Sequence, residues 1–297
     1  MIICSTEIDK DMLGRPISPG EARQAQVEML DLLADFCEKH GLTYYLSGGT
    51  LLGAVRHRGF IPWDDDIDVN MPRPDADRLI ELTGGVLNDH VEIAAPFGPV
   101  PHAVGYLRVY DKRYVLRSAS RDGRAFYYMN LFVDIFPIEG LPTDMKRVRR
   151  HYRVASTLIY LRKLAFFQGV PGKRGLNRTL RLIARPFAKL MGVDFWNRLL
   201  LRTALKYRYD TCEYVGVVTS NFHTVEEYIR REDYGTPARV EFEGKQYNAP
   251  ANAHRYLENL YGDYMQLPPP EKRGQHHQFE VYECRPAKEE RRIEQGH

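Results

Sequence analysis

The sequence predicts an α/β protein of the α+β type, with a mixed β-sheet core flanked by helices and an additional helical region. Three features carry this prediction: an amphipathic helix before a short apolar strand and a glycine turn, an acidic strand after the turn, and a later apolar strand with a single acid. A chain of 297 residues can bury a substantial core. We expect a core over residues 1–143, a basic helical insertion over 144–212 and a C-terminal region over 213–297, together forming one continuous domain over 30–270.

The first helix is predicted to begin just after Ser18. The segment Ser18-Pro19-Gly20-Glu21 has the form of a capping box with proline at the first helical position. Apolar side chains then recur at helical spacing from Val27 to Cys37, and Gly41 is a typical helix stop. We expect this helix to pack on the sheet.

Shorter patterns predict the other elements. Strands are expected at residues 43–47, 66–71, 91–95, 104–110, 114–117 and 131–136, helices at 51–57, 74–87 and 250–261, and a hairpin at 239–248. Pro137 should end the last of these strands, since proline cannot donate a backbone hydrogen bond, and Gly262 should end the last helix.

An aspartate cluster follows the glycine turn. In a strand starting at Asp66, the side-chain period of two places Asp66 and Asp68 on one face. Two carboxylates about 4 Å apart repel by roughly 4 kcal/mol at an effective dielectric near 20, and a bound cation removes that cost. Hard oxygen ligands of this kind suit Mg²⁺ or Mn²⁺. Asp64 and Asp65 are expected to position the turn instead.

A calcium loop or a solvated acidic turn are the structural alternatives. Asp64, Asp66 and Asp68 occupy the first, third and fifth positions of an EF-hand template. However, Val69 stands where that loop needs glycine, and prolines follow it. We therefore favour catalytic metal binding.

The second chemical feature is the glycine turn itself. Residues Ser47, Gly48, Gly49 and Thr50 break a short strand before a helix. A strand, glycine turn and helix expose backbone N–H groups that can hold a phosphate. A phosphate-binding site is therefore expected beside a metal-binding site.

Two segments resemble a known family. SGGTLLGAVRHRGFIPWDDDID, from Ser47 to Asp68, resembles the signature of LicD-type phosphocholine transferases, which are related to fukutin and the fukutin-related protein in the DNA polymerase β-like nucleotidyltransferase superfamily. The segment from Tyr256 to Pro269 is similar to the C-terminal end of that family. Residues 145–210 match no part of it.

The resemblance implies a nucleotidyltransferase-like sheet and a specific set of acids. Gly48-Gly49 would be the family's turn, Asp66 and Asp68 its acidic pair, and Asp134 its third acid on a later strand. A lone aspartate in the apolar run from Phe132 to Phe136 is costly to bury unpaired, which also favours a metal-ligand role for Asp134.

The implied reaction is Mg²⁺-dependent transfer of phosphocholine, or of a similar phospho-substituent, from a CDP-linked donor such as CDP-choline. The acceptor would be a hydroxyl of a cell-surface glycan or glycolipid, as in a lipopolysaccharide or teichoic acid precursor. Arg56 and His57 could neutralise donor phosphates or simply end a helix. Arg108 is a further candidate for substrate contact. Trp63 could face a quaternary ammonium, although it could equally be a core residue.

Two other functions compete with this one. A metal-dependent glycosyltransferase would use the DxD motif to hold a nucleotide sugar, but that architecture normally builds a nucleotide-binding βαβ half before its DxD, and only 63 residues precede Asp64. A non-enzymatic membrane-surface protein would instead use the segment from Met145 to Leu190, which is rich in Lys and Arg and contains no acid.

That basic segment predicts two or three helices broken at Gly169 to Gly175. Basic residues interleaved with bulky apolar ones suggest peripheral contact with an anionic membrane, and a solvated helical subdomain is the alternative.

The net charge of +3 gives no global field for nucleic acid, so no nucleic-acid partner is expected. Four scattered cysteines, no signal-peptide pattern and no long apolar run lead us to expect a cytoplasmic protein with reduced thiols, peripheral at the inner face of the membrane.

Overall fold

The computed structural model describes residues 10–119, 126–166, 176–220, 222–269, 271, 273 and 279–285. Its main sheet has the strand order β1 (Leu13–Pro16), β11 (Phe279–Cys284), β5 (Leu107–Ala119), β6 (Phe126–Leu141), β3 (Asp68–Pro72) and β2 (Tyr45–Leu46). Strand β4 (Val91–Ala94) also pairs with β5, and β7 (Tyr214–Val217) pairs with both β6 and β8 (Ile229–Arg230). Strands β3 and β6 are parallel and the other pairs are antiparallel, so the predicted mixed sheet is confirmed.

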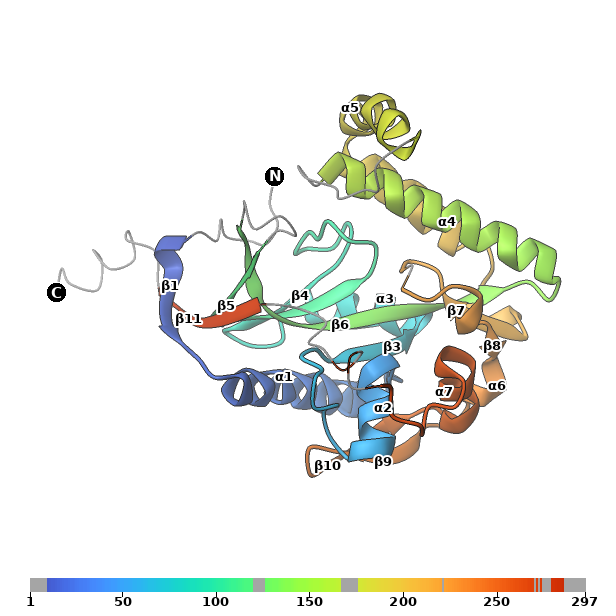
Figure 1. Cartoon of the computed structure of the whole chain (residues 1–297). Helices are drawn as coiled ribbons and strands as arrows, with labels where there is room; N and C mark the ends of the chain where they lie inside the picture. The colour runs from blue at the N-terminus through green and yellow to red at the C-terminus, as the bar shows by residue number, and fades with distance from the viewer. Residues whose placement is uncertain are drawn as a thin grey trace.

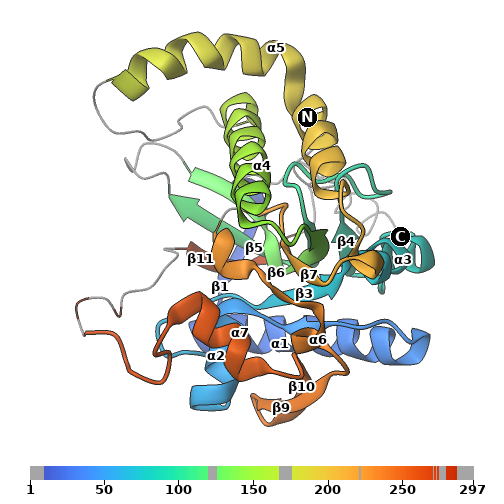
Figure 2. The same cartoon turned by 90° about the vertical axis from the view of Figure 1, so that its right-hand side faces the viewer.

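Helix α1 (Pro19–His40) forms as the sequence predicts. The Ser18 hydroxyl accepts the Glu21 N–H, the Glu21 side chain accepts the Ser18 N–H, and Gly41 ends the helix in the left-handed conformation. Its apolar face, which includes Leu30 and Leu33, is buried in the main core. Helix α1 lies on one side of the sheet in both Figure 1 and Figure 2.

Helix α2 (Gly48–His57) begins directly at the glycine turn, whereas the sequence predicted a start at residue 51. Helix α3 (Arg73–Thr83) ends before the predicted residue 87, because Gly84 adopts a left-handed conformation. The predicted hairpin is confirmed as β9 (Ala238–Phe242) and β10 (Lys245–Ala249). Helix α7 (Ala253–Tyr261) ends at Gly262 as predicted, and α6 (Arg231–Tyr234) is a single turn.

Three strand predictions were wrong. Strand β3 starts at Asp68, so Asp66 lies in the preceding loop. The two strands predicted on either side of residue 112 form one strand, β5, with an irregularity between Asp111 and Val115. Strand β6 continues through Pro137, because β5 pairs with β6 only up to Ile135 and β7 begins pairing at the next residue after the proline. Pro137, which has no N–H, therefore lies between the part of β6 that pairs with β5 and the part that pairs with β7.

The basic segment folds into α4 (Met145–Phe166) and α5 (Leu176–Ala204), which pack against each other on the side of the sheet opposite α1 (Figures 1 and 2). The predicted break at residues 169–175 lies outside the described residues. Helix α5 is kinked at Gly192, where φ is +77°. Within the described parts of the chain, no helix combines the length and apolar character needed to cross a bilayer.

The C-terminal segment completes the same sheet. Strand β7 pairs with β6, and β11 pairs with both β5 and β1, so residues far apart in the sequence share one hydrogen-bonded ladder. Among the described residues, Cys37 and Cys212 are free thiols.

Candidate active site

The centre of the site is a row of charged side chains across three adjacent strands. Asp68 of β3 is in register with Asp134 of β6, and Asp134 is in register with Arg108 of β5. Residues at one level of a pleated sheet project to the same face, so the three side chains lie side by side. Residues 66 positions apart are thus brought together by strand pairing.

Arg108 and Asp134 form a buried ion pair. The Arg108 Nε donates to Asp134 Oδ1, and Nη2 donates to Oδ2 at 2.7 Å. The guanidinium also lies 3.8 Å from the centroid of the Phe132 ring. Burial alone would lower the pKa of Arg108, but the Asp134 carboxylate holds it well above its ordinary value. Arg108 is therefore a fixed charge that orients Asp134.

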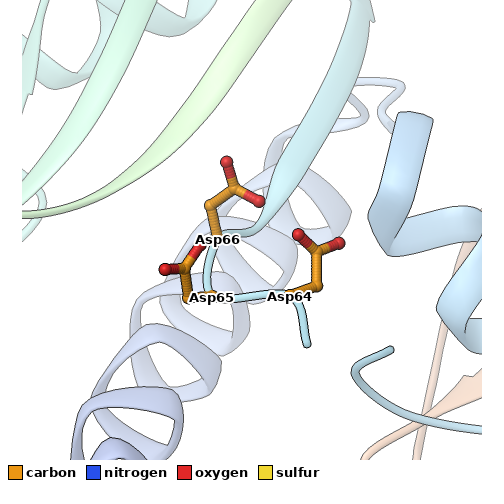
Figure 3. A group of neighbouring side chains, drawn as sticks. All are labelled: Asp64, Asp65 and Asp66. Atoms are coloured by element: carbon orange, nitrogen blue, oxygen red, sulfur yellow. The ribbon is translucent and has the colours of Figure 1, made fainter. Parts of the chain in front are cut away.

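The loop before β3 carries three more carboxylates. Ligand oxygens of Asp64, Asp65 and Asp66 lie within 4.8 Å of one another, and Figure 3 shows all three side chains extending from the same side of the loop. Helix α1 holds the loop in place, since Arg23 Nη2 donates to the Asp64 carbonyl at 2.7 Å and Gln26 Nε2 donates to the Asp65 carbonyl at 3.1 Å.

Asp64 and Asp66 of the loop and Asp68 and Asp134 of the strands line one cavity of about 670 Å³, and Asp263, just after α7, lines it as well. The structure therefore brings the three predicted aspartates together and adds Asp64, for which the sequence predicted only a turn-positioning role. The pKa of Asp68 is raised well above its ordinary value by burial and then by the charges of Asp66, Asp134 and Asp64.

This donor set fits a hard divalent cation. Among the described residues, the lining of the cavity offers carboxylate oxygens, the imidazole of His223 and no sulfur ligand. Burial, followed by repulsion among these carboxylates, raises the pKa of Asp68. A bound cation would remove the repulsion. Asp64, Asp66, Asp68 and Asp134 are the residues that could hold it.

The glycine turn is built around the same carboxylates. Gly48 has φ of +51°, and an added Cβ on Gly49 would lie 2.5 Å from the Asp64 Oδ2. The Asp68 N–H donates to the Thr50 hydroxyl at 2.8 Å, and the Ser47 N–H donates to the Asp68 carbonyl at 3.1 Å. Only glycine allows the turn to approach the aspartates this closely.

The other predicted residues are divided between the cavity and its surroundings. Arg56 lines the cavity and donates from Nη1 to the Tyr264 carbonyl at 2.8 Å. His57 is not part of the lining; its Nε2 accepts from Arg56 Nε at 3.0 Å, and burial followed by the Arg56 charge lowers its pKa. Trp63 lines the cavity and also packs against the core, so the two readings from the sequence are compatible.

Several lining residues were missed by sequence reasoning. Phe222 and His223 lie on the loop after β7, and no local pattern marks them. Tyr261 belongs to the C-terminal segment that resembles the family, so that segment was the available signal. Its ring centroid lies 5.6 Å from that of His223.

A smaller cavity of about 70 Å³ adjoins the first and shares Asp68, Phe222, His223 and Tyr261 with it. We call it the annex. Its wall also includes Glu227, whose Oε2 is buried and has no hydrogen-bond partner among the described residues. Burial, and then the charge of Glu226, raises the pKa of Glu227 to about 8. Aromatic rings and one unsatisfied carboxyl group therefore surround the annex.

An α+β sheet that holds a row of acids beside a glycine turn defines a group-transfer enzyme of the nucleotidyltransferase class. The family model described as LicD/FKTN/FKRP, nucleotidyltransferase domain, matches residues 41–152, which include the turn and Asp64, Asp66, Asp68 and Asp134. The lipopolysaccharide cholinephosphotransferase LicD of Haemophilus influenzae is 31% identical over 271 residues, covering 88% of this chain and 97% of that protein. The chain belongs to the LicD family and is a phosphotransferase.

Two other relatives match over shorter stretches of the chain. The human ribitol 5-phosphate transferase FKRP is 45% identical over 47 residues, which are 16% of this chain and 10% of that protein. The uncharacterized protein RP689 of Rickettsia prowazekii is 36% identical over 73 residues, 25% of this chain and 23% of that protein. Transfer of a phosphoryl-linked substituent is common to the named activities of LicD and FKRP.

Proposed function

We propose that this phosphotransferase moves phosphocholine from CDP-choline to a hydroxyl of a lipopolysaccharide, teichoic acid or other cell-surface glycan precursor. The main support is the similarity that extends along 97% of the Haemophilus influenzae enzyme, whose name specifies a cholinephosphotransferase. The proposal accounts for the carboxylate-lined cavity and for the aromatic annex beside it.

We assign Asp64, Asp66, Asp68 and Asp134 as the residues that hold Mg²⁺ or Mn²⁺. When bound, such an ion would supply charge neutralisation for the donor phosphates. Gly49 and Arg56 line the cavity beside these acids, and the Gly49 N–H and the Arg56 guanidinium would orient those phosphates. The Gly48 N–H donates to the Tyr256 hydroxyl at 3.4 Å and is not assigned this role. Because phosphoryl transfer depends mainly on positioning and electrostatics, these residues supply most of what the reaction needs.

In the proposed step, the acceptor oxygen attacks the choline-bearing phosphorus and forms a new P–O bond. The bond to the bridging oxygen breaks, and CMP leaves with its electron pair. Asp134 takes the hydroxyl proton, using a lone pair that its ion pair with Arg108 leaves available. Arg108 holds the Asp134 carboxylate in a fixed orientation during the transfer.

The annex supports choline as the transferred substituent. Phe136, Phe222 and Tyr261 contribute aromatic surface, and a quaternary ammonium group is attracted to such rings. A cation beside Glu227 would also stabilise its ionised form, which burial otherwise disfavours. A neutral polyol such as ribitol would gain neither interaction.

The test is donor selectivity, measured as CMP release with Mg²⁺ and a glycan extract as acceptor. CDP-choline should be turned over faster than CDP-ribitol, and Glu227→Gln should reduce the preference for CDP-choline without affecting CDP-ribitol. Glu258→Gln, at an exposed position of α7 that lines neither cavity, is the matched control. Turnover of CDP-ribitol alone would overturn the assignment of choline, and turnover of a UDP-sugar without CMP release from any CDP donor would favour the glycosyltransferase.

A further inference from the structure

A second large cavity lies between α4 and α5. Its volume is about 760 Å³, and it shares no lining residue with the carboxylate cavity. Arg147, Arg150 and Val154 line it from one face of α4, at helical spacings of three and four. Arg202 and Lys206 line it from the end of α5 and the residues just after. We call it the basic cavity.

The basic cavity concentrates positive charge without a compensating acid. None of its lining residues is Asp or Glu. Within the described parts of the chain, Arg147, Arg150, Arg202 and Lys206 form no ion pair. Like charges around one hollow repel each other, so an anion bound there is stabilised by all four.

A buried imidazole at the same place adds an unsatisfied polar group. His151 lines the basic cavity, is only 6% exposed, and its Nε2 has no hydrogen-bond partner among the described residues. Its ring lies against Tyr207, with centroids 5.3 Å apart. A buried polar atom without a partner is costly, and a ligand oxygen would satisfy it.

Apolar side chains in the wall indicate the kind of anion. Val154, which is 43% exposed, and the partly buried Leu158 and Leu199 line the cavity beside the cations. Arginine pairs especially well with phosphate oxygens because its fork of donors can bind two of them. Cationic groups together with exposed apolar groups match an amphiphile that carries phosphate.

We propose that the basic cavity binds the phosphate of an anionic phospholipid headgroup and thereby docks the enzyme on a membrane surface. Arg147, Arg150, Arg202 and Lys206 would hold the phosphate, and Val154, Leu158 and Leu199 would contact the lipid chains. This inference goes beyond the transfer reaction and does not depend on which substituent is transferred.

The test uses monomeric short-chain phosphatidylglycerol below its micelle concentration, with short-chain phosphatidylcholine and inorganic phosphate as comparison ligands. Binding is measured by isothermal titration calorimetry. The double variant Arg150→Gln/Arg202→Gln removes two cavity cations. The matched control Arg149→Gln/Arg153→Gln removes the same charge from exposed positions of α4 that do not line the basic cavity.

Wild type and control should bind phosphatidylglycerol alike, and the cavity variant should bind it at least about 30-fold more weakly, the factor expected for two cations. Sedimentation with phosphatidylglycerol vesicles should follow the same order. Equal losses in both double variants would reduce the site to a non-specific basic surface and overturn the proposal. So would inorganic phosphate binding as tightly as the lipid, or an absence of lipid binding to the wild type.

Discussion

Asp68 lies between other acids, whose repulsion favours binding of a cation but does not stabilise the fold. Asp66 and Asp64 approach it from the loop and Asp134 from the next strand, which raises its pKa well above the ordinary value after the effect of burial. The sequence predicted Asp66, Asp68 and Asp134 from a spacing and a resemblance. It did not predict that Arg108 would bind Asp134 directly. That contact depends on which strands pair.

Asp68→Asn should separate activity from stability. We expect turnover to fall at least about 100-fold, because a negative charge that would hold the metal is lost. In the presence of a chelator the free energy of unfolding should rise or stay the same, since a repelled buried carboxylate becomes neutral. CMP release and thermal unfolding measure the two effects. Asp35→Asn, on the exposed face of α1, is the control and should change neither.

Glu227→Gln should change the pH dependence of stability. The pKa of Glu227 is raised from 4.5 to about 8, so the unfolded state ionises first as pH rises. Wild-type protein therefore loses stability progressively between these two pH values, and the loss is about 3 kcal/mol at pH 7. The Gln variant should lack this loss. Chemical denaturation from pH 4.5 to pH 8 measures it, and a parallel pH profile for wild type and variant would contradict the buried, protonated carboxyl group.

At the scale of elements, local rules accounted for the helices better than for the strands. The capping box of α1 and its stop at Gly41 involve residues that contact each other within one turn, so the sequence was sufficient. Strand limits depend on partners elsewhere in the chain. Pro137 was predicted to end β6, but it occupies the gap between β5 and β7, where no antiparallel partner needs its N–H.

Gly49→Ala tests the contact between the glycine turn and the acidic loop. The new Cβ would lie 2.5 Å from Asp64 Oδ2, so the Asp64 carboxylate must move. We expect Mg²⁺ affinity to fall by about 10-fold and stability by roughly 1–3 kcal/mol. Metal titration by calorimetry and denaturant unfolding measure these changes. In Gly20→Ala, the control in α1, the nearest atom is Ser18 Oγ at 3.9 Å, and unchanged metal affinity is expected there.

At the scale of the whole molecule, the carboxylate cavity is a meeting point of distant segments. The loop before β3, the middle of β6, the loop after β7 and the end of α7 all contribute to its lining. The C-terminal strand β11 pairs with β5 and β1 and so ties the end of the described chain to its start. Sequence reasoning missed Phe222, His223 and Glu227 because no neighbouring residue marks them as part of a site.

A divalent cation should stabilise the whole fold. A ligand that binds only the folded state at 100 times its dissociation constant adds about 2.7 kcal/mol. Thermal unfolding should therefore shift upward with Mg²⁺, and a chelator should abolish CMP release. Potassium chloride at equal ionic strength should not reproduce the shift, and Asp68→Asn should lose most of it. An equal response of wild type and variant would place the ion elsewhere.

The sequence by itself determined the first helix with its caps, the hairpin, the glycine turn, the aspartate cluster and the family signature. Each depends on residues close together in the chain, where propensity and hydrogen bonding act locally. Only the tertiary structure decided that Asp68 lies beside Asp134, that Arg108 binds the latter, that Glu227 borders the annex, and that four cations of α4 and α5 surround one cavity. Strand register and helix packing make these contacts, and both depend on burial across the whole chain rather than on any one segment.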